Sequence, residues 1–211
     1  MSLYVSNDYE RCPSGVFLAR CYRILDIGTQ KSSFQGVDKL LRQVVFSWEV
    51  HAQNDEGRPL FTKDNRLFSI QEYYTLSWSE KSNLRKALQS WRGRPFSSEE
   101  MQKFDLKNVL GAWCMLNIID KQRDNGGVIS KVGSISPVPP MIRQNGLPEK
   151  RNKDQLFSLD DPDMEIFESL SDSLKEKIRN SPEWKRKQGV SPAVASQAAD
   201  SFDSSDDEIP F

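Results

Sequence analysis

Residues 41–52 read Leu-Arg-Gln-Val-Val-Phe-Ser-Trp-Glu-Val-His-Ala. Val44, Phe46, Trp48 and Val50 occupy alternate positions in this stretch, and such alternation predicts a β-strand with these four side chains on one face. Trp48 is therefore expected in the protein core. The turn signal that follows the stretch, Asn-Asp-Glu-Gly, marks the end of the strand.

Four further segments are rich in β-branched, aromatic and aliphatic residues and are predicted to be strands. They are residues 16–27, 66–75, 112–120 and 128–136. The polar residues 28–39 are expected to form a connection between the first two strands. Asp124-Asn125-Gly126-Gly127 is a strong hairpin signal and is predicted to join the last two strands.

Helical signals fill the interval between the third and fourth strands. Two capping boxes, Ser77 to Glu80 and Ser97 to Glu100, each predict the start of a helix. The order is then three strands, a helical segment and a closing two-stranded hairpin. That is the order of an OB-fold, a five-stranded Greek-key barrel, in a mainly β (α+β) chain. An antiparallel α+β sheet is the alternative.

The expected organisation has three parts. Residues 1–137 would form the OB-fold domain, residues 138–187 a linker and a helical appendage, and residues 188–211 a disordered acidic tail. Residues 138–160 lack periodicity and are predicted to wander over the surface, whereas an apolar stripe from Ile166 to Ile178 predicts packed helices.

The net charge of −1 hides an asymmetry between body and tail. Residues 1–187 carry 29 basic and 25 acidic groups, whereas residues 188–211 carry five carboxylates and no Lys or Arg. A mildly basic body with an acidic tail fits a nucleic-acid-binding protein whose tail would compete for its own binding groove.

Motifs for other classes of function are missing from the sequence. The three cysteines form no Cys-x-x-Cys pair, and the single His51 has no neighbours at metal-ligand spacing, so neither a metal nor a cofactor is expected. No P-loop and no Gly-x-Ser-x-Gly motif occurs, and we expect no enzyme. With no signal peptide and no apolar run of membrane-spanning length, the chain is expected to be cytoplasmic, without a membrane partner.

The last six residues carry a resemblance. Asp206-Asp207-Glu208-Ile209-Pro210-Phe211 resembles the acidic C-terminal peptide of bacterial and phage single-stranded DNA-binding proteins, which characteristically end Asp-Asp-Asp-Ile-Pro-Phe. Glu208 replaces the third Asp. The block from Tyr74-Thr75-Leu76-Ser77 to Ser90-Trp91-Arg92-Gly93-Arg94-Pro95-Phe96 is also similar to phage-encoded members of this class. A solubilising acidic tail is the alternative interpretation of the ending.

The resemblance implies a sequence-independent single-stranded DNA-binding protein of phage or bacterial DNA replication, recombination and repair. Residues 206–211 would then recruit replication and repair proteins, with Phe211 as the apolar anchor. Single-strand binders combine a basic groove with aromatic side chains on which bases stack. The DNA-binding residues predicted on these grounds are Arg20, Tyr22, Lys39, Arg42, Phe61, Lys63, Arg66, Tyr73 and Lys131.

Strand alternation refines this set. Tyr22 shares a face with Arg20, opposite Phe17, Ala19 and Cys21, and is expected to be exposed; Tyr73 is expected to oppose Ile70 and to be exposed as well. Lys131, on the last hairpin, would close the groove.

A protein-interaction adaptor, or a recombination accessory protein with the same tail, is the alternative function. The modest positive charge of the body keeps it open. If Arg20, Tyr22, Arg66 and Tyr73 converge on one open face, DNA binding is favoured, and scattered positions favour the adaptor. The sequence is also compatible with a homo-oligomer.

Overall fold

The computed structural model describes residues 10–34, 37–123 and 126–189 of the chain. Strand β1 (Gly15–Phe34) is the central strand of its sheet and pairs with β2 (Val37–His51) and with β4 (Trp113–Gln122). The outer strands are β3 (Phe68–Thr75), which pairs with β2, and β5 (Val128–Ser136), which pairs with β4. The short β6 (Gln155–Phe157) also pairs with β1.

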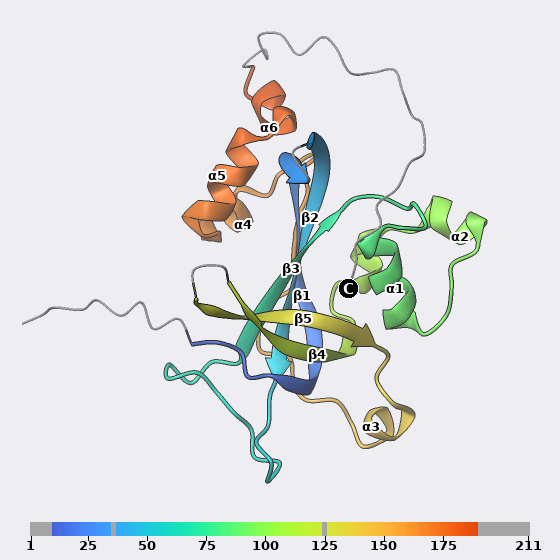
Figure 1. The fold of residues 1–211 in the computed structure, drawn as a ribbon, viewed down its shortest axis with the longest axis vertical. Coiled ribbons are helices and arrows are strands. Elements are labelled where there is room, and N and C mark those ends of the chain that lie inside the picture. The colour runs from blue at the N-terminus through green and yellow to red at the C-terminus, as the bar shows by residue number, and fades with distance from the viewer. Residues whose placement is uncertain (1–9, 35–36, 124–125, 190–211) are drawn as a thin grey trace, which may run out of the picture. The chain divides into compact units, whose positions relative to one another are not determined.

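The strand order is β3-β2-β1-β4-β5, within a six-stranded and mainly antiparallel sheet (Figure 1). The fold class is therefore mixed α+β, and the predicted succession of three strands, helical segment and hairpin is confirmed. Among the described residues β3 and β5 end the order without pairing with each other. The described strands therefore do not form the closed barrel that was expected.

In the described part of the chain, seven short helical elements accompany the sheet. They are α1 (Asn83–Arg92), α2 (Ser98–Lys103), the 3-10 helix η1 (Leu106–Val109), α3 (Pro140–Gln144), α4 (Met164–Ser169), α5 (Asp172–Asn180) and α6 (Pro182–Lys187). The box at Ser97 is confirmed, because the Ser97 hydroxyl accepts from the Glu100 N–H and the Glu100 carboxylate accepts from the Ser97 N–H. The box at Ser77 starts no helix, since α1 begins at Asn83 after a turn.

The predicted connection at residues 28–39 is wrong, because both flanking strands continue into it. β1 runs to Phe34 and β2 resumes at Val37, so most of the polar segment is paired backbone. Backbone pairing is indifferent to side-chain polarity, and Lys31 forms an ion pair with Asp38 of the neighbouring strand at 2.7 Å. The polar composition of this segment was therefore a misleading signal for the end of β1 and the start of β2.

The central part of β2 is buried on both of its faces. Trp48 is fully buried, as expected, but Val45, Ser47 and Glu49 on the opposite face are equally inaccessible. Arg151 and Asn152, which lie in the predicted surface connection, cover Glu49 and donate hydrogen bonds to it. The connection also contains α3 and β6, so its prediction as an irregular segment is corrected.

The chain divides into two compact units, each made of several segments. The first comprises Met1–Leu25, Val45–Tyr73 and Ala87–Leu156, and the second comprises Asp26–Val44, Tyr74–Lys86 and Phe157–Phe211. In the first unit, β1 and β4 pair Phe17 with Leu116 and Ala19 with Cys114, which places these side chains on one face. In β4, the side chains of Cys114, Leu116 and Ile118 are buried at alternate positions.

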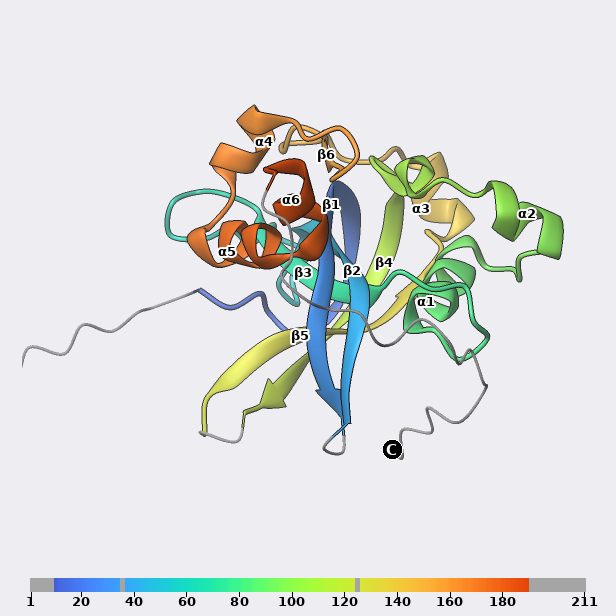
Figure 2. The same cartoon turned by 90° about the horizontal axis from the view of Figure 1, so that it is seen from above.

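The second unit contains the helical appendage. Helices α4, α5 and α6 lie together (Figure 2), and the Phe167 ring stacks on Trp184 with centroids 4.8 Å apart. Ser171 separates α4 from α5, and Ser181 caps α6. Gly28 of β1 has φ +73°, and a Cβ there would lie 2.5 Å from the Ser181 Cβ, so this close approach requires glycine. The apolar stripe is thus covered within its own unit.

Candidate nucleic-acid interface

A groove of about 670 Å³ separates β3 from the β4–β5 hairpin in the first unit. We call it the edge groove. It is lined by Arg11, Cys12, Ser69, Ile70, Gln71, Glu72, Tyr73, Arg123, Gly127, Val128, Ile129, Ser130 and Lys131. Two of the predicted DNA-binding residues, Tyr73 and Lys131, therefore belong to one site, and they come from the two outer strands of the sheet.

Tyr73 supplies the aromatic side chain of the edge groove. It is 38% exposed, on the face of β3 opposite the buried Ile70 and Tyr74, as alternation predicted. Burial of part of the side chain raises the pKa of the Tyr73 phenol, and this outweighs the lowering by the nearby Arg23 charge. The ring is consequently uncharged at neutral pH, which suits stacking against a nucleobase.

Lys131 forms an ion pair with Glu72 across the groove, with an N–O distance of 3.6 Å. Burial raises the pKa of Glu72, although the Lys131 charge and a hydrogen bond from the Val132 backbone N–H act in the other direction. Glu72 thus links β3 to β5 through its side chain where no backbone pairing is present among the described residues. The Lys131 ammonium has three N–H donors, so it can bind a further anion beside this carboxylate or in exchange for it.

Two more cations line the groove, and the sequence prediction missed both. Arg11 pairs with Asp120 at 3.3 Å, and both side chains are nearly half exposed. Arg123 lies at the end of the described part of the hairpin, where its N–H donates to the Gly127 carbonyl. Their positions immediately before a strand and before the hairpin turn are the signals that would have indicated them.

The segment at residues 10–12 connects the edge groove to a second cluster in the same unit. The Ser130 hydroxyl donates to the Cys12 carbonyl at 2.5 Å, and the Lys63 backbone N–H donates to the Glu10 carboxylate at 2.7 Å. Lys63 is exposed, and the half-buried Phe61 nearby lies beneath the Arg151 guanidinium, 5.3 Å from its Cζ. The loop that carries the predicted residues Phe61 and Lys63 is thus hydrogen-bonded to the residue before Arg11 of the groove, and Arg151, which was not predicted, packs on Phe61.

The predicted exposure of Arg20 as a phosphate contact is corrected, because its side chain is buried. Its side chain is 3% exposed, donates to Glu49 at 3.4 Å and to the Asn152 carbonyl at 3.3 Å, and pairs with Asp154. The covering segment at residues 151–154 encloses the face of β1 that alternation had left open. Arg20 is therefore part of a buried polar cluster.

The predicted exposure of Tyr22 is also corrected. It is 9% exposed, and its hydroxyl forms a 3.0 Å hydrogen bond with the Ser69 hydroxyl of β3. The Arg23 guanidinium also lies over its ring, at 5.5 Å from the centroid. The predicted stacking platform is hence enclosed, and Arg20 and Tyr22 do not join Tyr73 on an open face.

The remaining predicted DNA contacts are divided between the two units. In the first, Arg66 is exposed and pairs with Asp64 at 3.0 Å. In the second, Lys39 is exposed on β2, and Arg42 pairs with Asp26, whose hydrogen bond raises the pKa of the Arg42 guanidinium. The partner-docking residues Asp206, Asp207, Glu208, Ile209, Pro210 and Phe211 lie outside the described residues.

Glu49 is the centre of the buried cluster around Arg20. It is fully inaccessible, and one of its oxygens accepts from the Asn152 N–H at 2.7 Å, from the Asn152 amide at 2.8 Å and from the Arg151 N–H at 3.3 Å. Burial alone would raise the pKa of Glu49, but the hydrogen bonds from His51 and Asn152 and the Arg20 charge lower it to about 2. The carboxylate is ionised at neutral pH and holds residues 151–152 in place by these hydrogen bonds.

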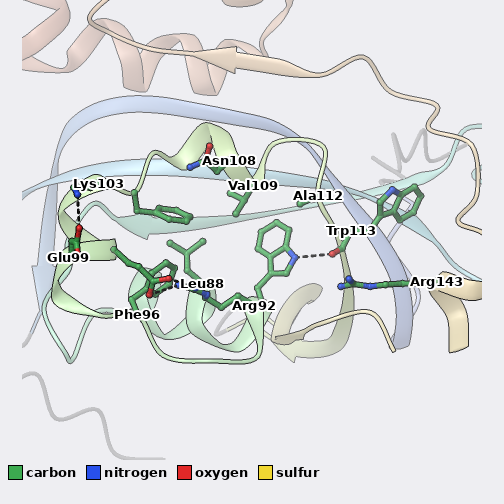
Figure 3. A pocket seen from close by; sticks show the side chains of 13 residues that line it. Leu88, Arg92, Phe96, Glu99, Lys103, Asn108, Val109, Ala112, Trp113 and Arg143 are labelled. Carbon is green, nitrogen blue, oxygen red and sulfur yellow. Dashed lines mark hydrogen bonds and ion pairs between the residues drawn. The ribbon is translucent and has the colours of Figure 1, made fainter. Parts of the chain in front are cut away.

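A second hollow in the first unit, of about 700 Å³, differs from the edge groove in its chemistry. We call it the aromatic hollow; Leu88, Trp91, Phe96, Phe104 and Trp113 contribute to its wall. The Trp91 indole donates to the Trp113 carbonyl at 3.0 Å. Lys103 pairs with Glu99 at the rim (Figure 3). Arg92 also packs on the Phe96 ring and pairs with Glu100 at 2.7 Å. Arg92 and Lys103 are thus paired with carboxylates, as Arg11 and Lys131 of the edge groove are, and the two sites differ in the number of aromatic side chains in their walls.

Neither the protein families, nor the curated proteins, nor the solved structures that were compared with this chain gave a match. Over residues 10–34, 37–123 and 126–189, no cluster of His, Cys, Asp and Glu is arranged to hold a metal ion. None of the helices in that part of the chain is long and apolar enough to cross a membrane.

Proposed function

We propose that this chain is a sequence-independent single-stranded DNA-binding protein that acts in phage or bacterial DNA replication, recombination and repair. The observation that carries the proposal is the edge groove, which places Tyr73 beside Lys131, Arg11 and Arg123. A ring for base stacking among cations for phosphate is the combination that sequence-independent single-strand binders use. No catalytic step is part of the proposal.

The strand order supports an OB-fold-like interpretation of the sheet. A five-stranded Greek-key barrel that is opened between its third and fifth strands has the linear order β3-β2-β1-β4-β5 found here. Glu72 of β3 reaches Lys131 and Val132 of β5 across that opening. We propose that this chain is such an opened barrel and that the opening is the DNA site.

Binding in the groove would depend on unpaired bases. A base in a single strand offers its face to the Tyr73 ring, whereas a base in a duplex has both faces covered by its neighbours. Phosphates would bind Arg11, Arg123 and Lys131, the last beside Glu72 or in exchange for it. In the same proposal residues 206–211, which resemble the docking peptide of single-stranded DNA-binding proteins, recruit replication and repair proteins.

The first test compares single-stranded and duplex DNA. We expect fluorescence anisotropy with labelled oligo-dT to give tighter binding than with a duplex of equal length, and the affinity to fall as salt rises because bound phosphates release counterions. Equal affinity for both forms, or binding that is independent of salt, would contradict the proposal.

A protein-interaction adaptor is a second candidate, and two observations favour it. DNA binding was expected to place Arg20 and Tyr22 on one open face with Tyr73. Both residues are instead buried and do not share such a face. The aromatic hollow also has the apolar, aromatic wall that suits a protein partner. If the chain fails to bind oligo-dT in the titration above, this candidate becomes the better one.

A further inference from the structure

The Phe61 ring and the Arg151 guanidinium form a stack that no motif in the sequence indicated. The Arg151 Cζ lies 5.3 Å from the centroid of the Phe61 ring, and Arg151 is exposed while Phe61 is half-buried. The guanidinium therefore lies over the ring at a cation–π distance, and Arg151 as a residue is exposed to solvent. Guanidinium planes and aromatic rings are the two surfaces on which proteins stack unpaired bases.

Arg151 is held in place from below by the buried cluster. Its backbone N–H donates to Glu49 at 3.3 Å, and the next residue, Asn152, donates two further hydrogen bonds to the same carboxylate oxygen. Arg20 completes the support, because it binds both Glu49 and the Asn152 carbonyl. An exposed arginine on a backbone fixed in this way loses less conformational entropy when a ligand binds.

Phe61 is held equally well within its loop. The N–H of the preceding Leu60 donates to the Ala52 carbonyl, and the N–H of the following Thr62 donates to the Arg66 carbonyl, both at 2.9 Å. The Lys63 N–H then donates to Glu10, one residue before the groove residue Arg11. The loop that carries Phe61 is thus hydrogen-bonded to the residue that precedes Arg11 of the edge groove.

We propose that Phe61 and Arg151 form a second base-stacking platform, which holds one unpaired nucleotide of a strand that also occupies the edge groove. The base would stack on the outer face of the Arg151 guanidinium, and the exposed Lys63 would neutralise a neighbouring phosphate. Glu49, Asn152 and Arg20 are positioning residues of this platform. The platform rests on the proposed single-strand function and extends it beyond the groove.

The test separates the planar guanidinium from its charge. Arg151→Lys keeps the positive charge but removes the plane, and Arg151→Ala removes both. For oligo-dT long enough to reach past the groove, we expect Arg151→Lys to weaken binding about 5- to 150-fold, the range for one stacked base, with an unchanged salt slope. Arg151→Ala should weaken it at least as much and reduce the salt slope by about one. For the shortest oligo-dT that binds, both variants should match the wild type.

Arg58→Lys is the matched control. Arg58 lies in the same loop as Phe61 and pairs with Glu56 at 2.8 Å, and among the described residues no aromatic ring lies beneath it. It should bind every length as the wild type does, and thermal melting establishes that each variant is folded. If the wild type binds oligo-dT and Arg151→Lys matches it at every length, the platform is wrong and the groove proposal stands. If the wild type binds no oligo-dT, the proposed function and the platform are both wrong.

Discussion

Replacing Arg20 with methionine is expected to lower the free energy of unfolding by about 3–5 kcal/mol, the range for breaking a buried ion pair from one side. Arg20 is 3% exposed and lies between the inaccessible Glu49 and the partly exposed Asp154. Methionine fills much of the same volume but leaves the Glu49 carboxylate without its buried cation. Urea or guanidinium denaturation of the two proteins measures the difference.

Arg58→Met is the control for this measurement. Its ion pair with Glu56 is largely exposed on both sides, so its loss should change the free energy of unfolding by no more than about 1 kcal/mol. A loss of less than about 1 kcal/mol in Arg20→Met as well would show that the buried cluster contributes little to stability.

The same cluster should give the protein a characteristic sensitivity to acid. The pKa of Glu49 is lowered to about 2 in the folded chain, below the ordinary value of about 4.3 in an unfolded one. The stabilisation is therefore complete above that unfolded value and is lost as the pH falls toward 2. We expect Glu49→Gln to be less stable at neutral pH and to lose less stability between about pH 4.5 and pH 2 than the wild type.

Replacing Tyr73 with alanine is expected to weaken binding to oligo-dT by about 1–3 kcal/mol, or about 5- to 150-fold in Kd, because one stacked base loses its ring. Tyr73 is the partly exposed aromatic side chain among the edge-groove residues, so the loss should be visible even with short oligonucleotides. Tyr73→Phe is the matched control and should stay close to the wild type, since it keeps the ring. An unchanged Kd for Tyr73→Ala would contradict the assignment of the groove.

Replacing Lys131 should act through charge. Lys131→Ala removes one phosphate contact and leaves the Glu72 carboxylate in the groove without its partner. We expect weaker binding of all sequences and a salt slope reduced by about one. Lys103→Ala is the control, because Lys103 also pairs with a glutamate, Glu99 at 2.7 Å, but lines the aromatic hollow. Equal losses in both variants would indicate a general charge effect.

Local sequence signals predicted most of the fold. The alternation at Val44, Phe46, Trp48 and Val50 placed four core side chains correctly, and the box at Ser97 gave the start of α2. The order of strands and helices followed from the change between the two-residue alternation of strands and the 3.6-residue spacing of helices. These features depend on residues near one another in the sequence, where pattern and structure are directly linked.

The errors arose where distant segments decide burial. Alternation places Arg20 and Tyr22 on the face opposite the core, but it does not show that residues 151–154 cover Arg20 or that Ser69 binds Tyr22. Tyr73 and Lys131 were predicted as DNA contacts one by one, whereas their meeting in one groove depends on the positions of β3 and β5. Arg151 was missed because its segment has no periodicity, and only the ring beneath it indicates a role.

The central claim is that single-stranded DNA binds in the edge groove, and the most direct measurement is an NMR titration of isotope-labelled protein with short oligo-dT. We predict that the largest amide shifts occur at residues 69–73 and 127–131 and at Arg11, which line the groove from both sides. Shifts centred on the aromatic hollow around Phe96, Phe104 and Trp113, or no shifts at saturating DNA, would contradict the account.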